Sequence, residues 1–429
     1  MTRLFVSIFI LGAVWIHAED RRPDPQRLTV MTFNAEFLWD GEAPEDGNPK
    51  VKFPWKGDPE AARKHMAAVA EVIRRHNPDM VNLVEVESLV ALETFNRGFL
   101  ADSGYRAYLV DGKDDFTGQD LGLLTRVDPV AALDREDRKG TSGDTTKSVS
   151  KNYTARFEVD GVKLALVGIH LLAQPDNPDR KPQREAQADA VRLRTRDLLA
   201  DGYQLIVLGD FNDWDARIPD HLDHRPISRV LEILADVSDD DTRDLQSVAG
   251  RLPKAERYTN FWDQNKNGEI DRPQEFSTLD HILLSPELAR RIERVAVDHT
   301  HDPRKVSDHY PLMVTLRLKG DPPPRGPRIV ALLPNPEGNE RFHETATLLN
   351  DGSEEVPMRG WVLRDSTGRI WRLDSMVGLP PGTPRTILRA GQAMGLNNAG
   401  DTVYLVDPAG VVVDTVVYKE AASGQTVTF

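Results

Sequence analysis

The chain has 429 residues, of which 39% are hydrophobic and 28% charged, and it carries a formal net charge of -14. This length predicts roughly two or three cores, and the composition is typical of soluble globular proteins rather than membrane-embedded or disordered ones. The absence of cysteine excludes disulfides, thiolate metal sites and cysteine nucleophiles. The acidic balance argues against high-affinity binding of a polyanion, but not against an enzyme that contacts one briefly through a metal ion.

The N-terminal residues have the pattern of an export signal. Arg3 supplies a positive charge, Leu4–Ile16 is mostly apolar, and Ala18 can precede a cleavage point. The apolar stretch is about 13 residues long, short of the ~20 that a spanning helix needs. We therefore expect residues 1–18 to be a signal peptide and the mature protein to be secreted or periplasmic; the alternative is a single membrane anchor. No later segment predicts stable membrane insertion.

Residues 28–318 alternate between strand-like and helix-like segments. The apolar runs with the length of strands are Leu28–Phe33, Met80–Val86, Lys163–Ile169 and Gln204–Leu208. Helices are expected over Pro59–His76, where apolar residues recur at helical spacing, and over the charged, amphipathic segment Glu185–Leu199. This interleaving predicts an α/β layered fold.

A proline-rich segment at residues 319–327 divides the chain. Its three consecutive prolines between glycines cannot continue a helix or a central strand, so they predict a stiff linker. Beyond it, residues 328–429 contain short β-branched runs, such as Thr402–Val406 and Val411–Val417, separated by turn signals and without a helical period. This part is expected to form a small β-sandwich.

Polar side chains stand where several of the strand-like runs end. Asn34, Glu85, His170 and Asp210 lie where a rigid scaffold can present reactive groups at a common rim. Each of them alone is more commonly a turn, a cap or a solvated residue. The ordered series of phrases is more specific, and it consists of Thr-Phe-Asn34, Val-Glu85-Val-Glu87, Ile-His170-Leu, Gly-Asp210-Phe-Asn212-Asp, Leu-Asp280-His-Ile-Leu-Leu and Ser-Asp308-His309-Tyr-Pro-Leu.

This series resembles the endonuclease/exonuclease/phosphatase superfamily, which has the DNase-I-like fold, over residues 28–318. The resemblance implies a four-layered α/β sandwich with the active site at one rim of two packed sheets. It also implies a hydrolase that uses Mg2+ or Mn2+ to cleave phosphate monoesters or diesters.

The same resemblance implies roles for individual residues. Asn34, Glu85 and Asp308 would be metal ligands in the oxygen-rich shell that Mg2+ prefers. His309 would act as general base or proton carrier, with Asp280 fixing its tautomer. His170 would donate to a phosphoryl oxygen or assist the leaving group, Asp210 would orient the attacking water, and Asn212 would donate to a nonbridging oxygen. Which histidine is the base and which the acid stays open.

A second motif resembles the first nine positions of an EF-hand calcium loop. Its oxygen-bearing residues are Asp263, Asn265, Asn267 and Asp271, with Gly268 at the position of the sharp turn. The usual acid at the twelfth position is missing, because Gln274 stands there and Glu275 comes one residue late. The loop therefore either binds Ca2+ and braces the segment before Asp280, or is a solvated loop beside the active site.

Residues 328–429 resemble the lamin-tail domain, an immunoglobulin-like β-sandwich. The resemblance rests on the segments Ile329–Gly338, Thr347–Gly352 and Arg359–Asp365, and it implies that Trp361 packs into the core of the sandwich. Such a domain would bind or tether an unknown extracellular partner, or would serve only as a passive stability module.

Three functions follow from these patterns. The favoured one is a secreted, metal-dependent phosphoesterase of the endonuclease type, whose partner is a phosphodiester substrate in nucleic acid. The first alternative is a phosphatase or phosphodiesterase for a lipid head group or small phosphate ester, and the second is a non-catalytic extracellular binding protein. The segment Asp134–Lys151, with five basic and four acidic residues, is not a basic patch, so it does not favour nucleic acid.

Overall fold

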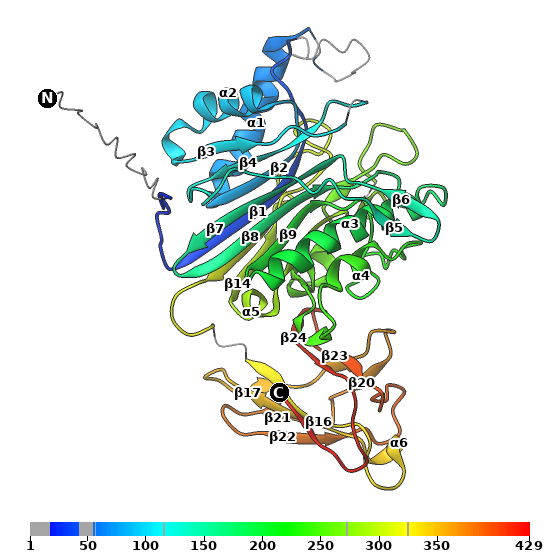
Figure 1. The fold of residues 1–429 in the computed structure, drawn as a ribbon. Helices are drawn as coiled ribbons and strands as arrows, with labels where there is room; N and C mark the ends of the chain where they lie inside the picture. The colour runs from blue at the N-terminus through cyan, green and yellow to red at the C-terminus, as the bar shows by residue number, and fades with distance from the viewer. Residues whose placement is uncertain (1–17, 43–54, 56, 115, 272, 324–325) are drawn as a thin grey trace, which may run out of the picture.

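The computed structural model describes residues 18–42, 55, 57–114, 116–271, 273–323 and 326–429 (Figure 1). The expected signal peptide lies outside the described residues except for its last position, and residues 324–325 of the expected linker lie outside them as well. Among the helices that are described, none has both the length and the apolar character needed to cross a membrane.

The first sheet of the larger domain mixes parallel and antiparallel pairs. In the described part of the chain its strands are, in spatial order, β14 (Ile292–Val297), β15 (Leu312–Arg317), β1 (Arg27–Leu38), β2 (Met80–Val86), β4 (Asp120–Thr125) and β3 (Arg106–Leu109). Its outer face carries the helices α1 (Pro59–His76) and α2 (Leu89–Phe99). Helix α1 has the bounds that the sequence predicts, because Asp58 caps its start and Asn77 adopts a left-handed conformation at its end.

The second sheet forms the other half of the larger domain. Its described strands are, in spatial order, β10 (Gln246–Ser247), β13 (Asp280–Leu284), β9 (Gln204–Asp210), β8 (Val162–His170) and β7 (Lys151–Val159). Helices α3 (Lys181–Ala200) and α4 (Val230–Ala235) cover its outer face.

Helix α3 is not simply amphipathic, contrary to the prediction for Glu185–Leu199. Arg184, Glu185, Gln187 and Asp189 are all buried on it. Each of them hydrogen-bonds to a backbone or side-chain group of a segment that lies outside the second sheet.

The two sheets pack face to face and confirm the four-layered α/β sandwich. Side chains from both sheets, such as Val84, Leu208 and Val314, share one buried core between the sheets. Separate cores lie between the first sheet and α1–α2 and between the second sheet and α3–α4. The order of layers is therefore helices, sheet, sheet, helices (Figure 1).

Shorter elements complete the larger domain. They are the hairpin of β5 (Gly140–Ser142) and β6 (Thr145–Lys147), the pair β11 (Asn260–Phe261) and β12 (Phe276–Ser277), helix α5 (Pro286–Ala289), and the 3-10 helices η1 (Ala101–Ser103), η2 (Asp241–Arg243), η3 (Val248–Arg251) and η4 (Lys254–Glu256).

The C-terminal domain is a β-sandwich, as the sequence predicts. One sheet has the order β22 (Arg385–Leu388), β17 (Thr345–Asn350), β16 (Pro327–Leu333) and β25 (Val427–Thr428); the other has β20 (Ile370–Arg372), β19 (Val362–Arg364), β23 (Asp401–Val406) and β24 (Val412–Tyr418); a short pair joins β18 (Val356–Pro357) to β21 (Gly378–Leu379). Trp361 and the fully buried Trp371 belong to its core. The sequence of this domain has no helical period, and the helix described in it is the single turn α6 (Glu340–His343), which is too short to produce one.

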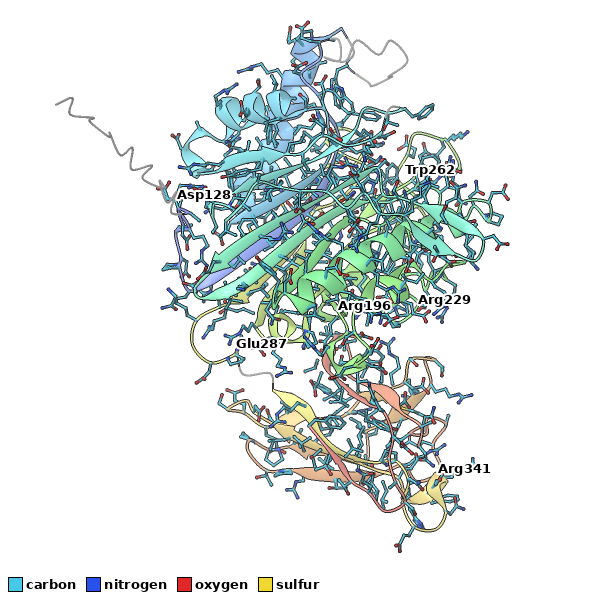
Figure 2. All side chains as sticks on the ribbon, viewed as in Figure 1. Asp128, Arg196, Arg229, Trp262, Glu287 and Arg341 are labelled. Carbon is cyan, nitrogen blue, oxygen red and sulfur yellow. The ribbon has the colours of Figure 1, made fainter. Side chains whose placement is uncertain are left out.

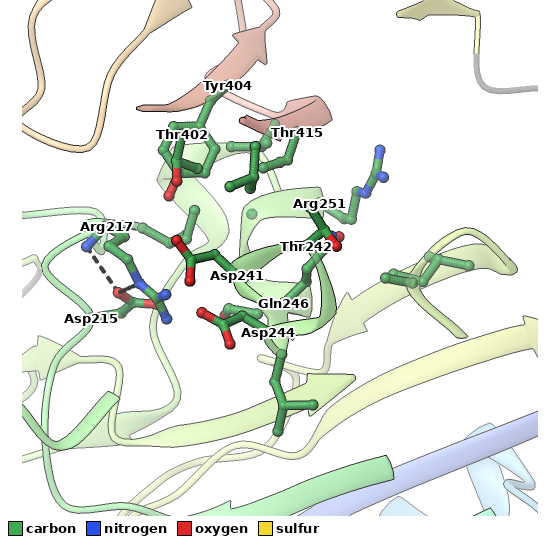
Figure 3. A pocket seen from close by; sticks show the side chains of 18 residues that line it. Asp215, Arg217, Asp241, Thr242, Asp244, Gln246, Arg251, Thr402, Tyr404 and Thr415 are labelled. Carbon is green, nitrogen blue, oxygen red and sulfur yellow. Dashed lines mark hydrogen bonds and ion pairs between the residues drawn. The ribbon is translucent and has the colours of Figure 1, made fainter. Parts of the chain in front are cut away.

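The two domains contact each other directly. Ile218 and Ala249 of the larger domain pack with Tyr404, Val406 and Val412 of the sandwich. Hydrogen bonds cross the same interface from the Arg364 side chain to the Arg217 carbonyl (2.9 Å) and from the Lys254 amide to the Ala409 carbonyl (3.0 Å). A small pocket of about 110 Å³ lies beside these contacts, where acidic side chains of the larger domain face threonines of the sandwich (Figure 3).

Candidate active site

Strand pairing brings the predicted site residues to one edge of the sandwich. Asp210, at the end of β9, is in register with His170, at the end of β8, and with Asp280, at the start of β13. In the other sheet, Asn34 on β1 is in register with Val84, the residue before Glu85 on β2. The loop before β15 adds Asp308 and His309 at the same edge, since Ser307 Oγ donates to the Asn34 carbonyl (2.6 Å).

His309 and Asp280 form a buried pair. Nδ1 of His309 lies 2.6 Å from Oδ2 of Asp280, and both side chains are almost fully buried. Burial alone would lower the pKa of His309, but the carboxylates of Asp280, Asp308 and Asp210 outweigh it and raise this pKa well above its usual value. The pair therefore fixes the ring orientation and favours the imidazolium in the protein without a bound cation.

Asp210 lies between the two histidines. Its Oδ2 is 3.6 Å from Nε2 of His170 and 3.8 Å from Nε2 of His309. Burial raises the pKa of Asp210 to about 7 against the opposing charge of His309. Burial, together with Lys151 and His309, lowers the pKa of His170 well below its usual value, so this imidazole is neutral at neutral pH. The site thus holds one cationic and one neutral histidine about a single carboxylate.

Acidic side chains crowd the first sheet's part of the edge. The Asn34 side-chain amide donates to Glu85 Oε1 and to Asp210 Oδ2, each at 3.3 Å. Glu36 accepts from the backbone amide of Asp308 (3.1 Å), and burial together with Asp308 raises the pKa of Glu36 to about 8. Burial likewise raises the pKa of Glu85. So many desolvated carboxylates are unfavourable unless protons or a cation neutralise them.

This donor set fits a hard divalent cation. The possible metal ligands are all oxygen atoms: the carboxylates of Glu85, Asp308 and Glu36 and the side-chain oxygen Oδ1 of Asn34. The described residues contribute no thiolate. Within the described chain, no group of three or more histidine and acidic side chains is arranged as a ready-made metal site. Mg2+ is one such cation, because it keeps several waters and needs only one or two protein carboxylates.

Strained backbone conformations mark the same edge. Glu36, Phe37, Glu85 and Asn212 have φ values of 48°, 61°, 65° and 50°, in the left-handed region that non-glycine residues avoid. Each such residue costs on the order of 1–3 kcal/mol and persists only where surrounding contacts hold it. At Glu85 the strain coincides with a register shift between β2 and β4 after Val84, which aims the carboxylate away from the regular sheet.

A cavity of about 790 Å³ opens from these residues to the surface. Its inner wall includes Glu85, His170, Asp210, Asn212, Asp308 and His309. Its rim includes Arg225 and Trp262; the Trp262 side chain is 64% exposed and lies among the loops of the larger domain (Figure 2). A substrate can therefore approach the carboxylates and both histidines from one side.

Contacts define the positions of Asn212 and of two further residues near the site, Lys151 and Glu87. Asn212 Nδ2 donates to the Leu171 carbonyl (3.1 Å), which links the loops after β8 and β9. Lys151 is in register with His170 and binds Gln119 and Asp114, so its charge lies within the site rather than on a solvated surface. Glu87 accepts from the backbone amide of Asp40 (3.2 Å) and holds a neighbouring loop.

The sequence reasoning missed Glu36, Asn260 and Arg184. Glu36 follows Asn34 by two residues within β1, and this spacing could have indicated that both side chains belong to the site. The Asn260 side-chain nitrogen lies 3.1 Å from Nε2 of His309, but nothing in its local sequence distinguishes it. Arg184 stands just before the segment Glu185–Leu199, which is predicted to be a charged, amphipathic helix, and the observed helix begins earlier, at Lys181.

Arg184 ties the two catalytic loops together. The side chains of Arg184 and Asp213 are completely buried and form an ion pair at 2.8 Å. The guanidinium also donates to the carbonyls of Gln174 (3.2 Å) and Pro175 (2.8 Å), in the loop that follows His170. Asp213 immediately follows Asn212, so a single cation positions both loops at the cavity floor.

The predicted calcium loop lies beside the cavity. Asp263, Asn265, Asn267 and Asp271 form a compact loop closed by hydrogen bonds between their side chains and backbone amides. Gln264 from this loop lines the cavity.

The chain was compared with curated proteins and with solved structures. No curated protein matches the chain significantly. Among solved structures, TDP2 from Caenorhabditis elegans has 16% identity over 68% of this chain and 74% of its own, with a TM-score of 0.43. The 3' phosphatase NExo from Neisseria, bound to a product DNA hairpin, has 20% identity over 67% and 98% of the two chains, with a TM-score of 0.44. An AP endonuclease from Archaeoglobus fulgidus has 15% identity over 68% and 100%, with a TM-score of 0.44.

Family models cover both domains. Residues 322–420 match the Lamin Tail Domain, so the C-terminal sandwich is a lamin-tail domain as predicted. Residues 31–309, which include all the strands that carry the site, match the model of the Endonuclease/Exonuclease/phosphatase family. The chain therefore belongs to the endonuclease/exonuclease/phosphatase family.

Proposed function

We propose that the protein is an exported, Mg2+- or Mn2+-dependent phosphodiesterase that cleaves nucleic acid. The observation that carries the proposal is the single cavity in which Glu85 and Asp308 face Asp210 and both histidines. Hydrolysis at phosphorus needs a metal, an activated water and donors for the developing charge, and these residues can meet the three needs together.

The metal would be held by Glu85 and Asp308, with Asn34 and Glu36 beside them. When bound, it supplies positive charge to the phosphoryl oxygens and to the leaving oxygen. The metal would also neutralise the crowded carboxylates. Without a cation, burial raises the pKa values of Glu85 and Glu36.

The protein residues divide the proton transfers. Asp210 has a pKa of about 7, suited to accepting a proton from the attacking water near neutral pH. His309, held by Asp280 and cationic, donates to a phosphoryl oxygen. Neutral His170 faces Asp210 from the other side and orients it. Arg184 keeps the loops that carry His170 and Asn212 in register.

Two features of the rim support nucleic acid as the substrate. The exposed indole of Trp262 offers a face for base stacking, and exposed Arg225 offers a cation for a flanking phosphate. The net charge of -14 predicts that binding between turnovers is weak, so the Michaelis constant should be high and should rise further with salt. The expected N-terminal signal supports export.

A substrate panel with the purified full chain tests the proposal. Plasmid DNA, RNA, sphingomyelin, inositol phosphates and a chromogenic phosphodiester are each incubated with Mg2+, Mn2+ or EDTA. The proposal expects metal-dependent cleavage of DNA or RNA and loss of this cleavage in His309→Ala. Faster turnover of sphingomyelin or inositol phosphates than of either nucleic acid would replace the substrate assignment, and undiminished activity in EDTA would overturn the metal.

A further inference from the structure

The Asp263–Asp271 loop has the backbone of a calcium-binding loop. Lys266 and Gly268 have φ values of 58° and 75°, which fold the chain so that Asp263, Asn265, Asn267 and Asp271 face one another. Asp263 accepts hydrogen bonds from the amides of Asn267 (3.1 Å) and Gly268 (2.9 Å). The loop geometry alone does not establish a ligand, since Asp- and Asn-rich turns adopt it without one.

An independent observation comes from Glu275, which lies outside the loop. Its side chain folds back, and Oε2 accepts from the backbone amide of Asp271 (2.8 Å). Glu275 is only 5% exposed, and its Oε1 is buried without a hydrogen-bond partner. None of the ion pairs among the described residues involves Glu275. A buried carboxylate oxygen without a donor is costly, and a cation beside it would remove that cost.

Glu275 stands one residue after the position at which an EF-hand loop carries its acid. Glu275 and Asp271 are joined by a backbone hydrogen bond, from the Glu275 amide to the Asp271 carbonyl (3.3 Å), which adds one residue to the turn. The longer turn returns the carboxylate to Asp271, and Asn265, Asp271 and Glu275 line the same hollow. The acid that an EF-hand carries at its twelfth position is thus supplied by the thirteenth residue here.

The amide side chains of the loop already point at negative charge. Nδ2 of Asn265 and Nδ2 of Asn267 both donate to Oδ2 of Asp271, at 2.6 and 3.0 Å. Their Oδ1 atoms accept from the backbone amides of Asn267 (3.0 Å) and Glu269 (2.8 Å), and each oxygen keeps a second lone pair that can bind a cation. A bound ion would draw Asp263, Asp271 and Glu275 together with these amide oxygens, since no three acidic side chains of the described chain are grouped for a metal without one. Such a set suits Ca2+, because Ca2+ accepts six to eight oxygens in irregular geometry and Mg2+ does not.

We propose that Asp263, Asn265, Asn267, Asp271 and Glu275 bind a Ca2+ ion that braces the rim of the active-site cavity. The Trp262 amide donates to the Glu275 carbonyl (2.8 Å), so the two ends of the loop are joined directly below the exposed indole. Gln264, Gln274 and Glu275 line the cavity as well as the hollow. Ca2+ would therefore hold Trp262 and the segment leading to Asp280 in place. Only this effect on the cavity rests on the proposed function; the binding itself does not.

The test measures Ca2+ binding to the full chain without substrate. A Glu85→Gln background weakens cation binding at the catalytic edge, and isothermal titration then reports the loop. We expect a dissociation constant of about 10⁻⁵–10⁻³ M, the range of weaker sensor and extracellular sites. Saturating Ca2+ should raise the melting temperature by several degrees, and an equal concentration of Mg2+ should raise it much less. Tb3+ should show luminescence sensitised by Trp262, the residue adjacent to Asp263.

Matched variants locate the ion. Asp271→Asn and Glu275→Gln should each weaken Ca2+ binding at least tenfold and reduce the Tb3+ signal. Glu269→Gln is the control, because the Glu269 side chain is 78% exposed and this position of such a loop contributes its backbone carbonyl. Circular dichroism shows whether each variant is folded, and Tb3+ titration of Trp262→Phe separates loss of the sensitiser from loss of the ion.

Some results would overturn the calcium site. They are an unchanged melting temperature and no heat with Ca2+ in the parent protein, equal responses to Ca2+ and Mg2+, or equal losses in Glu269→Gln and Asp271→Asn. Because no substrate is present, a protein inactive on every phosphodiester can still bind Ca2+ here, and an active enzyme can fail to bind it.

Discussion

The carboxylate of Asp210 is the most sensitive group of the site, because it lies within 4 Å of both imidazoles. Its pKa of about 7 means that the proton acceptor is ionised only as the pH rises through neutrality. The rate should therefore increase with pH along a limb that Asp210 sets, at a pH below 7 once a bound cation favours ionisation. Asp210→Asn should lower kcat by about 10²–10⁴-fold and abolish this limb.

The pH profile of kcat/KM for parent and variant checks this role. If Asp210→Asn keeps the same ascending limb at a reduced rate, another group accepts the proton.

The His309–Asp280 pair predicts a separable effect of orientation. Asp280→Asn should leave the fold intact but lower kcat by roughly 10²–10⁴-fold, since the amide no longer stabilises the imidazolium or fixes its tautomer. The chain provides a matched control in His76, whose Nε2 lies 2.8 Å from Asp298; neither residue lines the cavity. Steady-state kinetics should show His76→Gln unchanged. Similar losses in both variants would indicate a general effect of breaking Asp–His pairs rather than a catalytic one.

At the scale of elements, the ends of β8 and β9 fix the geometry of the site. Gly209 has a φ of 139°, and a Cβ at this position would lie 1.9 Å from the Ile169 carbonyl oxygen. Only glycine lets β9 pass this close to β8 and deliver Asp210 beside His170. Gly209→Ala should therefore cost more than about 3 kcal/mol of stability or prevent folding.

A second glycine separates the clash from the backbone strain. Gly161, in the turn between β7 and β8, also has a positive φ, of 78°, but nothing lies within 4 Å of a Cβ there. Gly161→Ala should cost only about 1–2 kcal/mol. Urea unfolding of both variants makes the comparison; equal losses would refute the close-approach explanation.

Elements with strong local signals could be predicted from the sequence. Helix α1 carries its own proline start and capping residue, and the strands that end at His170 and Asp210 are continuous apolar runs. The polar residues at the ends of these runs predict a site at a common edge of the sheets, and the strand pairing brings them together there.

Residues whose role depends on distant partners could not be predicted. Asn260 reaches His309 only because a two-residue strand, β11, bridges to the loop before β15. Arg184 is buried because the loops after β8 and β9 fold over α3, which no helical periodicity can reveal. Glu275 is a further example, because the hydrogen bond between its carboxylate and the Asp271 amide depends on how the loop folds.

On the scale of the whole molecule, the lamin-tail domain is docked rather than merely tethered. Arg257 of the catalytic domain is almost fully buried and donates to the carbonyls of Ala249 (3.0 Å) and Leu252 (2.9 Å) in its own domain and of Gly410 in the sandwich. The loop that follows Asn212 continues to Ile218, which packs against Tyr404. The domain contact thus adjoins the loop that carries Asn212.

The interface also predicts a dependence of stability on pH. Asp244 lines the interdomain pocket (Figure 3), and burial together with Asp236 and Asp241 raises its pKa to about 7. In the unfolded chain this carboxyl has a pKa of about 4, so the folded state holds the proton more tightly. Stability is therefore lost as the pH rises from about 4 through about 7.

Replacing the carboxyl tests this dependence. Asp244→Asn should stabilise the protein at pH 8 by about 1–2 kcal/mol, after allowance for its partial exposure, and should leave it unchanged near pH 4. Asp239→Asn, at a side chain that is 94% exposed, is the control. Thermal unfolding from pH 4 to 8 gives the comparison; a stabilisation that does not grow with pH would contradict the prediction.

The proposed mechanism is tested most directly by the metal-dependent hydrolysis of a chromogenic phosphodiester by the parent protein and by Glu85→Gln. The proposed catalytic cation would be held by Glu85 and Asp308, which line the same cavity as Asp210 and both histidines. We predict that Mg2+ or Mn2+ restores activity to EDTA-treated parent protein, and that Glu85→Gln lowers kcat/KM by at least about 10²-fold with a higher metal requirement. Hydrolysis that survives EDTA, or a Glu85→Gln variant as active as the parent at low metal concentration, would contradict it.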